Sequence, residues 1–197
     1  MNIIFVRHAE TEGNITGLVQ GPEHRGFTKK GLEEARTISE KLKGEHFSFA
    51  YSSDSPRCKE TAEAINKFHN LPIKYTSILR EKYNGDFTGK NYKEVNWKEL
   101  EGTFEERKVK NGENLQEVRE RARSFIAELL KNHGNNDSIL VVTHGAFLKI
   151  LIGDLLGINM QNSIFRIKVN HCSPIRVTFK DQTFENAMHK NIPVIEL

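Results

Sequence analysis

The sequence is poor in the features that mark secreted, zinc-binding and membrane proteins. It has only two cysteines, Cys58 and Cys172, and neither belongs to a CxxC pair, so a zinc site of that type is not expected. Two free thiols are the simpler interpretation, with a single disulfide as the alternative. No apolar run approaches the roughly 18 residues that a membrane helix needs. Residues 1–7 read directly as a strand with no leader before them, so we expect a cytoplasmic protein.

The sequence also lacks a strong charge of either sign. Charged residues make up 28% and hydrophobic residues 37% of the chain, and the net charge is only +3. This is the ordinary balance of a globular protein. Lys and Arg are scattered among Asp and Glu, so nothing indicates a nucleic-acid partner. The length of 197 residues suits one core, and we interpret residues 1–197 as a single domain.

Short apolar runs alternate with helical patterns along the chain. The runs at 2–6, 47–51, about 73–77 and 139–143 look like buried strands, which favours a parallel sheet covered on both faces. Apolar residues at helical spacing predict helices at 32–42, 57–69, 115–129 and 146–156. The alternation predicts an α/β fold, a three-layer α/β/α sandwich with a mixed, mainly parallel sheet.

Two regions depart from this alternation. Beyond residue 160 the pattern predicts two closing strands, 163–169 and 174–180, joined by a short turn at 171–174. Residues 82–112 lack clear periodicity, except for a short helix expected near 91–100. We interpret 82–112 as an insertion that faces the substrate, because long loops on such scaffolds often carry specificity.

Charged and imidazole side chains follow four of the predicted strands. In an open α/β sheet, ligands bind at the carboxyl ends of the strands. In strand order along the chain, these side chains are Arg7 with His8, then Arg57, Glu81 and His144. They come from four separate places in the sequence. Because each follows the carboxyl end of a predicted parallel strand, we expect them to meet at one edge of the sheet.

These residue types suit chemistry on a phosphoryl group. Two guanidinium groups can bind phosphate oxygens in a forked geometry. A neutral imidazole can attack phosphorus and form a phosphohistidine. A carboxylic acid can protonate the leaving alcohol and later activate water. Since the task is mainly positioning and charge stabilisation, we expect no metal and no cofactor.

The same residues lie in motifs that resemble those of the histidine phosphatase superfamily, also called the phosphoglycerate mutase-like family. Residues 7–11, Arg-His-Ala-Glu-Thr, together with Asn14 resemble its Arg-His-Gly-Glu-Thr signature. Five further segments are similar to family motifs in the same order, so the resemblance covers nearly the whole chain: 27–32, 52–62, 79–89, 112–114 and 143–145. One departure is Ala9 in place of glycine, which would be strained only in a left-handed backbone conformation.

The resemblance implies a role for each residue at the predicted sheet edge. It implies that His8 is the phosphorylated nucleophile and that Glu81 is the proton donor and later the base. The residues that it implies as phosphate ligands are Arg7, Asn14, Arg57 and His144. It places the chain in the phosphatase branch, as an enzyme that hydrolyses a small phosphomonoester.

The substrate itself is not readable from the sequence. We expect the residues that select it in the 15–27 loop and in the 82–112 insertion. The candidate specificity residues are Gln20, Gly21, Lys82 and Tyr83. The expected partner is a small phosphorylated metabolite, and the oligomeric state stays open.

Two other functions remain open. Cofactor-dependent phosphoglycerate mutases are similar, but they carry a longer insertion after the acid; the segment here is short and has no adjacent pair of arginines. The chain could also be a catalytically silent module that binds phosphorylated ligands. A pure binding module would not need both His8 and Glu81.

Overall fold

The computed structural model describes residues 1–21, 26–189 and 192–193, and these contain seven strands in one sheet. The strands are β1 (Asn2–Arg7), β2 (Phe49–Ser53), β3 (Ile73–Thr76), β4 (Ser138–Thr143), β5 (Pro174–Lys180), β6 (Thr183–His189) and β7 (Ile192–Pro193). Their spatial order is β3-β2-β4-β1-β5-β6-β7. The first four strands in this order pair in parallel, and β5, β6 and β7 add in antiparallel fashion.

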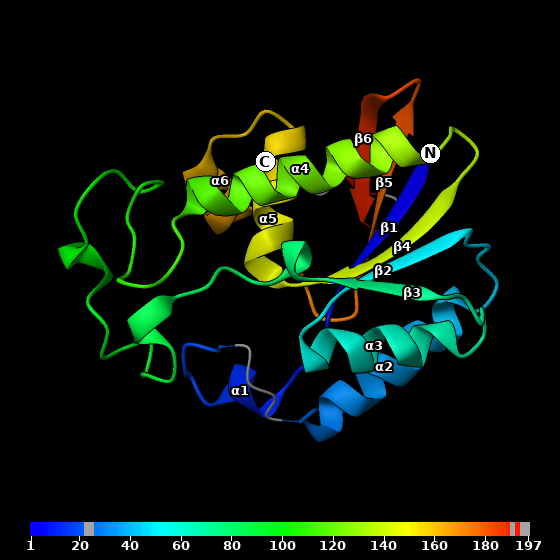
Figure 1. The fold of residues 1–197 in the computed structure, drawn as a ribbon. Helices are drawn as coiled ribbons and strands as arrows, with labels where there is room; N and C mark the ends of the chain where they lie inside the picture. The colour runs from blue at the N-terminus through cyan, green and yellow to red at the C-terminus, as the bar shows by residue number, and fades with distance from the viewer. Residues whose placement is uncertain (22–25, 190–191, 194–197) are drawn as a thin grey trace.

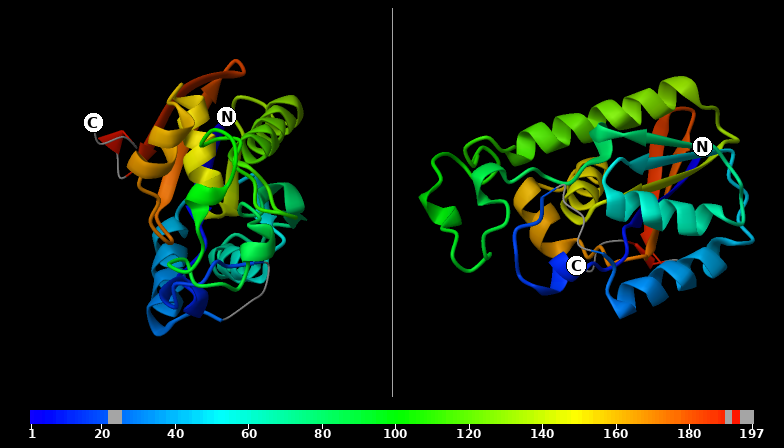
Figure 2. Two further views of the ribbon diagram at one scale, coloured as in Figure 1. Left: turned by 90° about the vertical axis from the view of Figure 1, so that its left-hand side faces the viewer. Right: turned by 60° about the horizontal axis from the view of Figure 1, so that its bottom comes forward.

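Helices cover both faces of this sheet. They are α1 (Glu12–Ile15), α2 (Lys29–Leu42), α3 (Pro56–Asn66), α4 (Leu115–Asn132), α5 (Gly145–Leu155) and α6 (Met160–Arg166). Figure 1 shows α2 and α3 on one side of the sheet and α4, α5 and α6 on the other, and Figure 2 shows the same layers from two further directions. The predicted three-layer α/β sandwich with a mixed sheet is therefore confirmed. No helix in the described ranges is long and apolar enough to cross a membrane.

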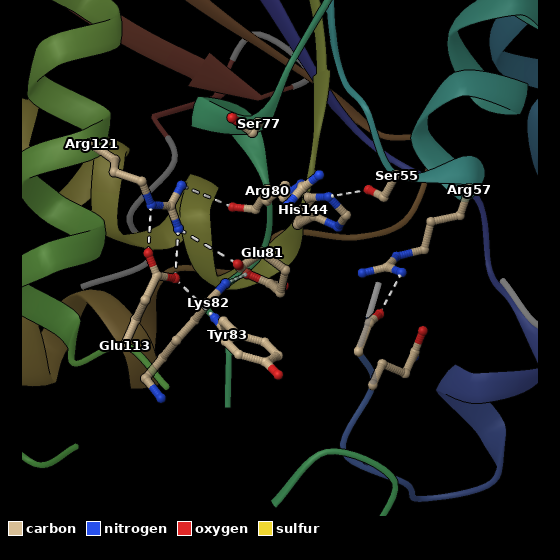
Figure 3. A pocket seen from close by; sticks show the side chains of 12 residues that line it. Ser55, Arg57, Ser77, Arg80, Glu81, Lys82, Tyr83, Glu113, Arg121 and His144 are labelled. Atoms are coloured by element: carbon tan, nitrogen blue, oxygen red, sulfur yellow. Dashed lines mark hydrogen bonds and ion pairs between the residues drawn. The ribbon is translucent and has the colours of Figure 1, made fainter. Parts of the chain in front are cut away.

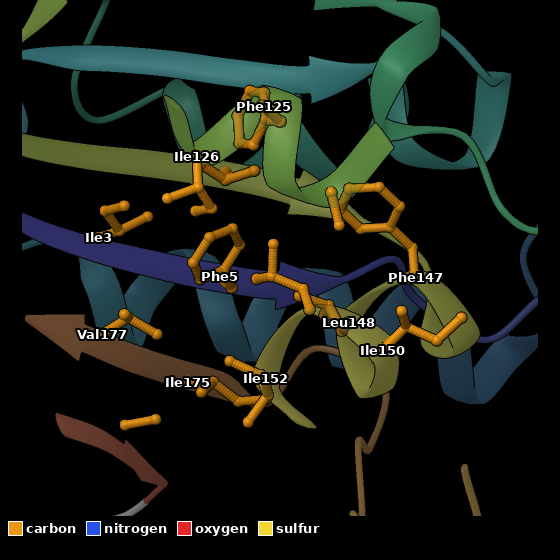
Figure 4. Close-up of a cluster of buried hydrophobic side chains, with 14 of the residues drawn as sticks. Ile3, Phe5, Phe125, Ile126, Phe147, Leu148, Ile150, Ile152, Ile175 and Val177 are labelled. Carbon is orange, nitrogen blue, oxygen red and sulfur yellow. The ribbon is translucent and has the colours of Figure 1, made fainter. Parts of the chain in front are cut away.

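The central strands bury both of their faces, as their continuous apolar sequences predict. Along β1, Ile3 and Phe5 join a core cluster with α4 and α5, whereas Ile4 and Val6 join a second cluster with α2 and α3. Figure 4 shows Ile3 and Phe5 among side chains of α4, α5 and β5. Successive side chains of a strand point to opposite faces, so β1 contributes to two separate hydrophobic cores.

Polar residues begin α2, α4 and α5, and one of them is the candidate site residue His144. His144 is the N-cap residue of α5 and directly follows β4. Thr28 caps α2, and its hydroxyl accepts a hydrogen bond from the N–H of Gly31 at 2.9 Å. Asn114 and Glu117 form a reciprocal capping box at the start of α4. The chain therefore turns sharply from strand or loop into helix at the edge where the predicted site lies.

The region 82–112 is mostly irregular and extends beyond the sheet at the left of Figure 1, drawn in green. Its only regular pieces in the described chain are single 3-10 turns at Gly85–Phe87 and Trp97–Glu99. Its two ends are joined, because the N–H of Asp86 donates to the carbonyl of Lys110 at 3.1 Å. Gly85 has φ of 48°, and a Cβ there would lie 2.1 Å from that carbonyl oxygen, so the junction requires glycine.

Three expectations from the sequence are corrected here. Residues 163–169 do not form a strand. Residues 163–166 belong to α6, which buries Met160 and Ser163 and leaves Phe165 exposed, and Ile167 is the buried residue that caps its end. Their alternation resembled a strand, but Ser163 packs against Gly153 of α5 and the helical spacing prevails. The short helix near 91–100 is only a single 3-10 turn, and β2 begins at residue 49 instead of 47.

Candidate active site

A cavity of about 360 Å³ opens at the carboxyl edge of the parallel strands. Figure 3 shows its lining, contributed by the 20–21 loop, the segments after β2, β3 and β4, and α4 with the residue before its cap. Of the residues singled out in the sequence, those that line the cavity are Gln20, Gly21, Arg57, Glu81, Lys82, Tyr83 and His144. The tertiary fold therefore gathers seven residues from four separate parts of the chain.

His8 directly follows β1 and contacts Arg57 of the cavity lining, and only 3% of its surface is exposed. Its Nδ1 is 2.8 Å from the carbonyl oxygen of Ala9, and its Nε2 is 3.2 Å from the Nε of Arg57. A carbonyl only accepts and a guanidinium only donates, so Nδ1 carries the proton and the lone pair of Nε2 accepts from Arg57. Local backbone and Arg57 together select the tautomer of His8.

Arg7 lies at the end of β1 beside the first turn of α5. Its Nη1 donates to the carbonyl of Val169 at 2.9 Å, while its buried Nε has no partner among the described residues. A Cβ on Gly145 would lie 3.2 Å from the guanidinium carbon, so glycine makes room for the arginine. A buried, partly unpaired guanidinium is a donor set suited to an anion.

His144 is fully buried, with its ring centroid 5.2 Å from that of His8. Its Nε2 is 2.9 Å from both the Ser53 and the Ser55 hydroxyls, and 3.3 Å from the Sγ of Cys58. The sequence motif contained these three residues, but nothing in their spacing indicated a contact with His144. The turn from β2 into α3 therefore orients the second histidine.

Burial sets the protonation state of both histidines. Desolvation, followed by the positive charges of Arg57 and Arg7, holds the pKa of His8 well below its ordinary value of 6.5. Desolvation and Arg57 lower the pKa of His144 in the same direction. Both imidazoles are therefore neutral near pH 7, which leaves the Nε2 of His8 able to act as a nucleophile.

Glu81 reaches the same cavity from the segment after β3. Its carboxylate accepts hydrogen bonds from the backbone N–H groups of Ala146 and Phe147, each at 3.1 Å, and from the backbone N–H of Lys82 at 3.0 Å. The first two donors belong to the first turn of α5, where unpaired N–H groups and the helix dipole favour a carboxylate. Glu81 and His144 are thus both held at the start of one helix.

Asn14 contacts the turn that carries the 7–11 motif. Its Oδ1 accepts from the N–H and the hydroxyl of Thr11 at 2.9 and 2.8 Å, and, like Arg7 and His8, it is not among the residues that line the cavity. Ala9 carries no strain, because it is not among the described non-glycine residues with positive φ. Its buried methyl group is compatible with the backbone of the 7–11 turn.

The candidate specificity residues differ in what they contact. The carbonyl of Gly21 accepts from Nη1 of Arg57 at 3.1 Å, which ties the 15–21 loop to the site. The ammonium of Lys82 donates to Oδ1 of Asn84 at 2.8 Å, and burial lowers its pKa. Tyr83 is 44% exposed at the cavity mouth. His24, which belongs to the 15–27 loop, lies outside the described residues.

His171 also lies close to His8, which the sequence did not indicate. Its ring centroid lies 5.6 Å from that of His8, although it appeared to be only part of a turn. One ligand atom each of His171, Glu10 and Glu34 lie within 4.8 Å of one another. The ammonium of Lys30, however, is 2.7 Å from Glu10 and 3.4 Å from Glu34, so a side chain already balances these carboxylates. We assign no ion to this group.

Comparison with known proteins identifies the family. The model of the histidine phosphatase superfamily (branch 1) matches residues 3–192, and the chain belongs to this superfamily. It is 30% identical over 164 residues to the adenosylcobalamin/alpha-ribazole phosphatase of Escherichia coli K12, covering 80% of each chain. It is 32% identical over 174 residues to the 2,3-bisphosphoglycerate-dependent phosphoglycerate mutase of Bartonella quintana, covering 82% of this chain and 84% of the other.

A solved structure shows the same fold. The alpha-ribazole phosphatase from Shigella flexneri superposes with a TM-score of 0.87 over 100% of both chains, at 22% identity. The relatives of this chain are thus phosphatases and mutases, which supports an enzyme.

Proposed function

We propose that this protein is a phosphatase that hydrolyses a small phosphomonoester through a phosphohistidine on His8. The observation that carries the proposal is the orientation of the His8 ring. Nδ1–H donates to the Ala9 carbonyl, and the lone pair of Nε2 accepts from Arg57, which lines the cavity. A neutral, buried imidazole with a fixed tautomer is the arrangement that nucleophilic catalysis needs.

In the first step, Nε2 of His8 forms a bond to phosphorus as the bond from phosphorus to the leaving oxygen breaks. Arg57 must exchange its contact with Nε2 for a contact with a phosphate oxygen, so the substrate itself frees the nucleophile. Arg7 supplies a second guanidinium, and His144 lies beside the reacting ring. Glu81, in its protonated form, gives its proton to the leaving oxygen.

In the second step, a water oxygen forms a bond to phosphorus and the bond between phosphorus and Nε2 breaks. Glu81 takes the proton from this water, which restores the acid for the next cycle. The products are an alcohol and inorganic phosphate, and His8 returns to its neutral form. Two guanidinium groups can balance the phosphoryl charge, so the proposed reaction needs no metal and no cofactor.

The proposed substrate is a small phosphorylated metabolite, since a cavity of about 360 Å³ is in the range of small-molecule sites. We propose that Gln20, Gly21, Lys82 and Tyr83 contact the part of the substrate beyond the phosphate. Both cysteines are free thiols, which supports a cytoplasmic location.

Phosphoglycerate mutase activity is the second candidate, because relatives with that name match most of the chain. In a mutase, the phosphohistidine returns its phosphate to a second hydroxyl group instead of water. Two of the cations in the cavity wall are already paired, Arg80 with Asp54 and Arg121 with Glu113, which leaves them less available to a substrate carboxylate. This supports hydrolysis over transfer.

The first experiment is hydrolysis of 4-nitrophenyl phosphate in EDTA by the wild type, His8→Ala and the control His46→Ala, which removes an exposed imidazole. We expect activity to survive EDTA and the control, and to fall by at least about a thousandfold in His8→Ala. Activity that persists in His8→Ala, or disappears in EDTA, would contradict the proposal. Turnover of 3-phosphoglycerate with its bisphosphate primer at a rate comparable to hydrolysis would establish the mutase instead.

A further inference from the structure

An ion pair at the start of α4 lies directly behind the segment that carries Glu81. The Nε of Arg121 is 2.8 Å from Oε1 of Glu113, and its Nη2 is 2.9 Å from Oε2. Both side chains are mostly shielded, with 22% and 24% of their surfaces exposed. Figure 3 shows this two-pronged contact beside Glu81, Lys82 and Tyr83. Forked arginine–carboxylate pairs hold a fixed geometry.

The remaining donors of Arg121 bind the backbone around Glu81. Nη1 donates to the carbonyls of Ile78 at 2.7 Å and Arg80 at 3.1 Å, and Nη2 lies 3.5 Å from the carbonyl of Glu81 itself. The hydroxyl of Thr143 donates to the carbonyl between them, that of Leu79, at 2.6 Å. Four successive carbonyls are therefore contacted by side chains from outside the segment.

Glu113 holds the other side of the acid. Its Oε2 accepts from the N–H of Tyr83 at 2.9 Å, and its own N–H donates to the carbonyl of Tyr83 at 2.8 Å. The guanidinium of Arg121 also lies 5.5 Å from the ring centroid of Phe147, whose N–H donates to the Glu81 carboxylate. The ion pair thus contacts the chain before Glu81, the chain after it, and the helix that receives its carboxylate.

We propose that Arg121 and Glu113 are positioning residues that hold Glu81 in place as the proton donor and base. This inference rests on the proposed function, because it assumes that Glu81 serves the leaving oxygen. A general acid must stay within hydrogen-bond reach of the atom that it protonates. Displacement by about 1 Å can cost on the order of a hundredfold in rate. Arg121 uses its donors on the protein, so its role differs from that of a substrate ligand.

The test compares Arg121→Met with Arg123→Met. Arg123 lies on the same helix and forms a two-pronged ion pair with Asp154, with both contacts at 2.7 Å. Asp154 lies near the end of α5, whereas the carboxylate of Glu81 contacts its first turn. Both variants remove one forked ion pair from α4. Only the first removes the contacts with residues 78–81. Arg123 is 62% exposed and Arg121 only 22%, so the comparison of two substrates, and not the loss of activity alone, separates a positioning effect from a loss of stability.

The first readout is a series of aryl phosphates from 4-nitrophenyl to phenyl phosphate. Nitrophenolate leaves without a proton, whereas phenolate needs one. The quantity compared is kcat/KM, which reports the first step alone, because kcat also contains the water step that needs Glu81 for every substrate. We expect Arg121→Met to lose about tenfold or more in kcat/KM on phenyl phosphate and less than about threefold on 4-nitrophenyl phosphate. Glu81→Gln should show the same pattern, and adding Arg121→Met to it should cost little more. Equal losses on both substrates, or equal losses in Arg123→Met, would overturn the inference.

The second readout is amide hydrogen exchange at Lys82, Ala146 and Phe147, whose N–H groups hold the carboxylate. It requires no turnover. Faster exchange at these amides in Arg121→Met, and not in Arg123→Met, is the expected result; unchanged exchange would overturn the inference. Failure of the proposed function would appear elsewhere, as hydrolysis that does not depend on His8.

Discussion

The Nε of Arg57 donates to the Nε2 of His8 across 3.2 Å, so the lone pair of a buried imidazole accepts from a fixed positive charge. The same guanidinium donates through Nη1 to the carbonyl of Gly21. Arg57 lines the cavity and therefore connects the proposed nucleophile His8 to the loop before residue 22. The positive charge of Arg57 disfavours protonation of His8.

The protonation of His8 gives the first prediction. Burial, Arg57 and Arg7 lower its pKa, so its ring should remain neutral from pH 8 to about pH 6, with Nδ1 protonated throughout. Arg57→Met removes a positive charge and should raise this pKa, whereas Arg36→Met, at an exposed position on α2, should not. Nitrogen NMR of labelled histidine measures both effects. Titration of wild-type His8 near 6.5 would contradict the assignment.

Acid stability gives the second prediction. Burial lowers the pKa of His171 to about 4, and the pKa values of His8 and His144 are lowered as well. The unfolded chain takes up these protons near pH 6.5 and the folded chain does not, so the unfolded state is stabilised relative to the folded state as the pH falls. The free energy of unfolding should be constant above pH 7 and decline from about 6.5 towards 4.

This decline can be separated from the titration of carboxylates. His171→Asn removes one of the three imidazoles, so its melting temperature should fall less between pH 6.5 and 4.5 than that of the wild type. Calorimetry across this range measures the difference. Parallel curves for the two proteins would show that His171 is not held neutral by the fold.

The serines beside His144 give the third prediction. Ser53→Ala or Ser55→Ala alone leaves one hydroxyl for the Nε2 of His144, so each should cost about 1 kcal/mol. The double variant leaves only the weak Cys58 thiol and should cost about 1–3 kcal/mol more, with a larger loss of activity. Urea unfolding and aryl phosphate hydrolysis measure these effects. Ser48→Ala, at the opposite end of β2 from Ser53, is the control. Strictly additive small losses would argue against a shared role.

A glycine beneath the 7–11 turn gives the fourth prediction. A Cβ on Gly31 would lie 1.9 Å from the carbonyl oxygen of Glu10, so Gly31→Ala must push this turn away from α2. We expect a loss of about 1–3 kcal/mol in the free energy of unfolding, together with reduced activity. Gly44→Ala meets nothing within 4 Å and should change stability by less than about 1 kcal/mol. Equal behaviour of the two variants in urea would contradict the packing argument.

Much of the fold was predictable because the central strands have unambiguous sequences. The apolar runs that became β1 and β4 are buried on both faces, and only a parallel sheet between two helical layers accommodates such strands. The region after residue 160 was not predictable in the same way. Its apolar residues fit both a strand and a helix, and the packing of Ser163 against Gly153 favours the helix α6.

The site shows the same division. Parallel strands end at one edge, so the positions of Arg7, His8 and His144 near one another follow from sequence order and topology alone. The turn of Asn14 towards Thr11 was not visible in the sequence. Neither was the approach of His171 to His8, because a turn residue carries no periodic signal that indicates its neighbours.

The sequence by itself determined which chemistry this protein carries: a histidine at a strand end, two arginines, a carboxylate and a second histidine, in motifs of one superfamily. Only the tertiary structure decided how those groups are held. The tautomer of His8 and the bracing of Glu81 by Arg121 depend on contacts at 2.7 to 3.5 Å between segments up to 49 residues apart. Such contacts depend on backbone positions that packing sets, and no local pattern of residues encodes them.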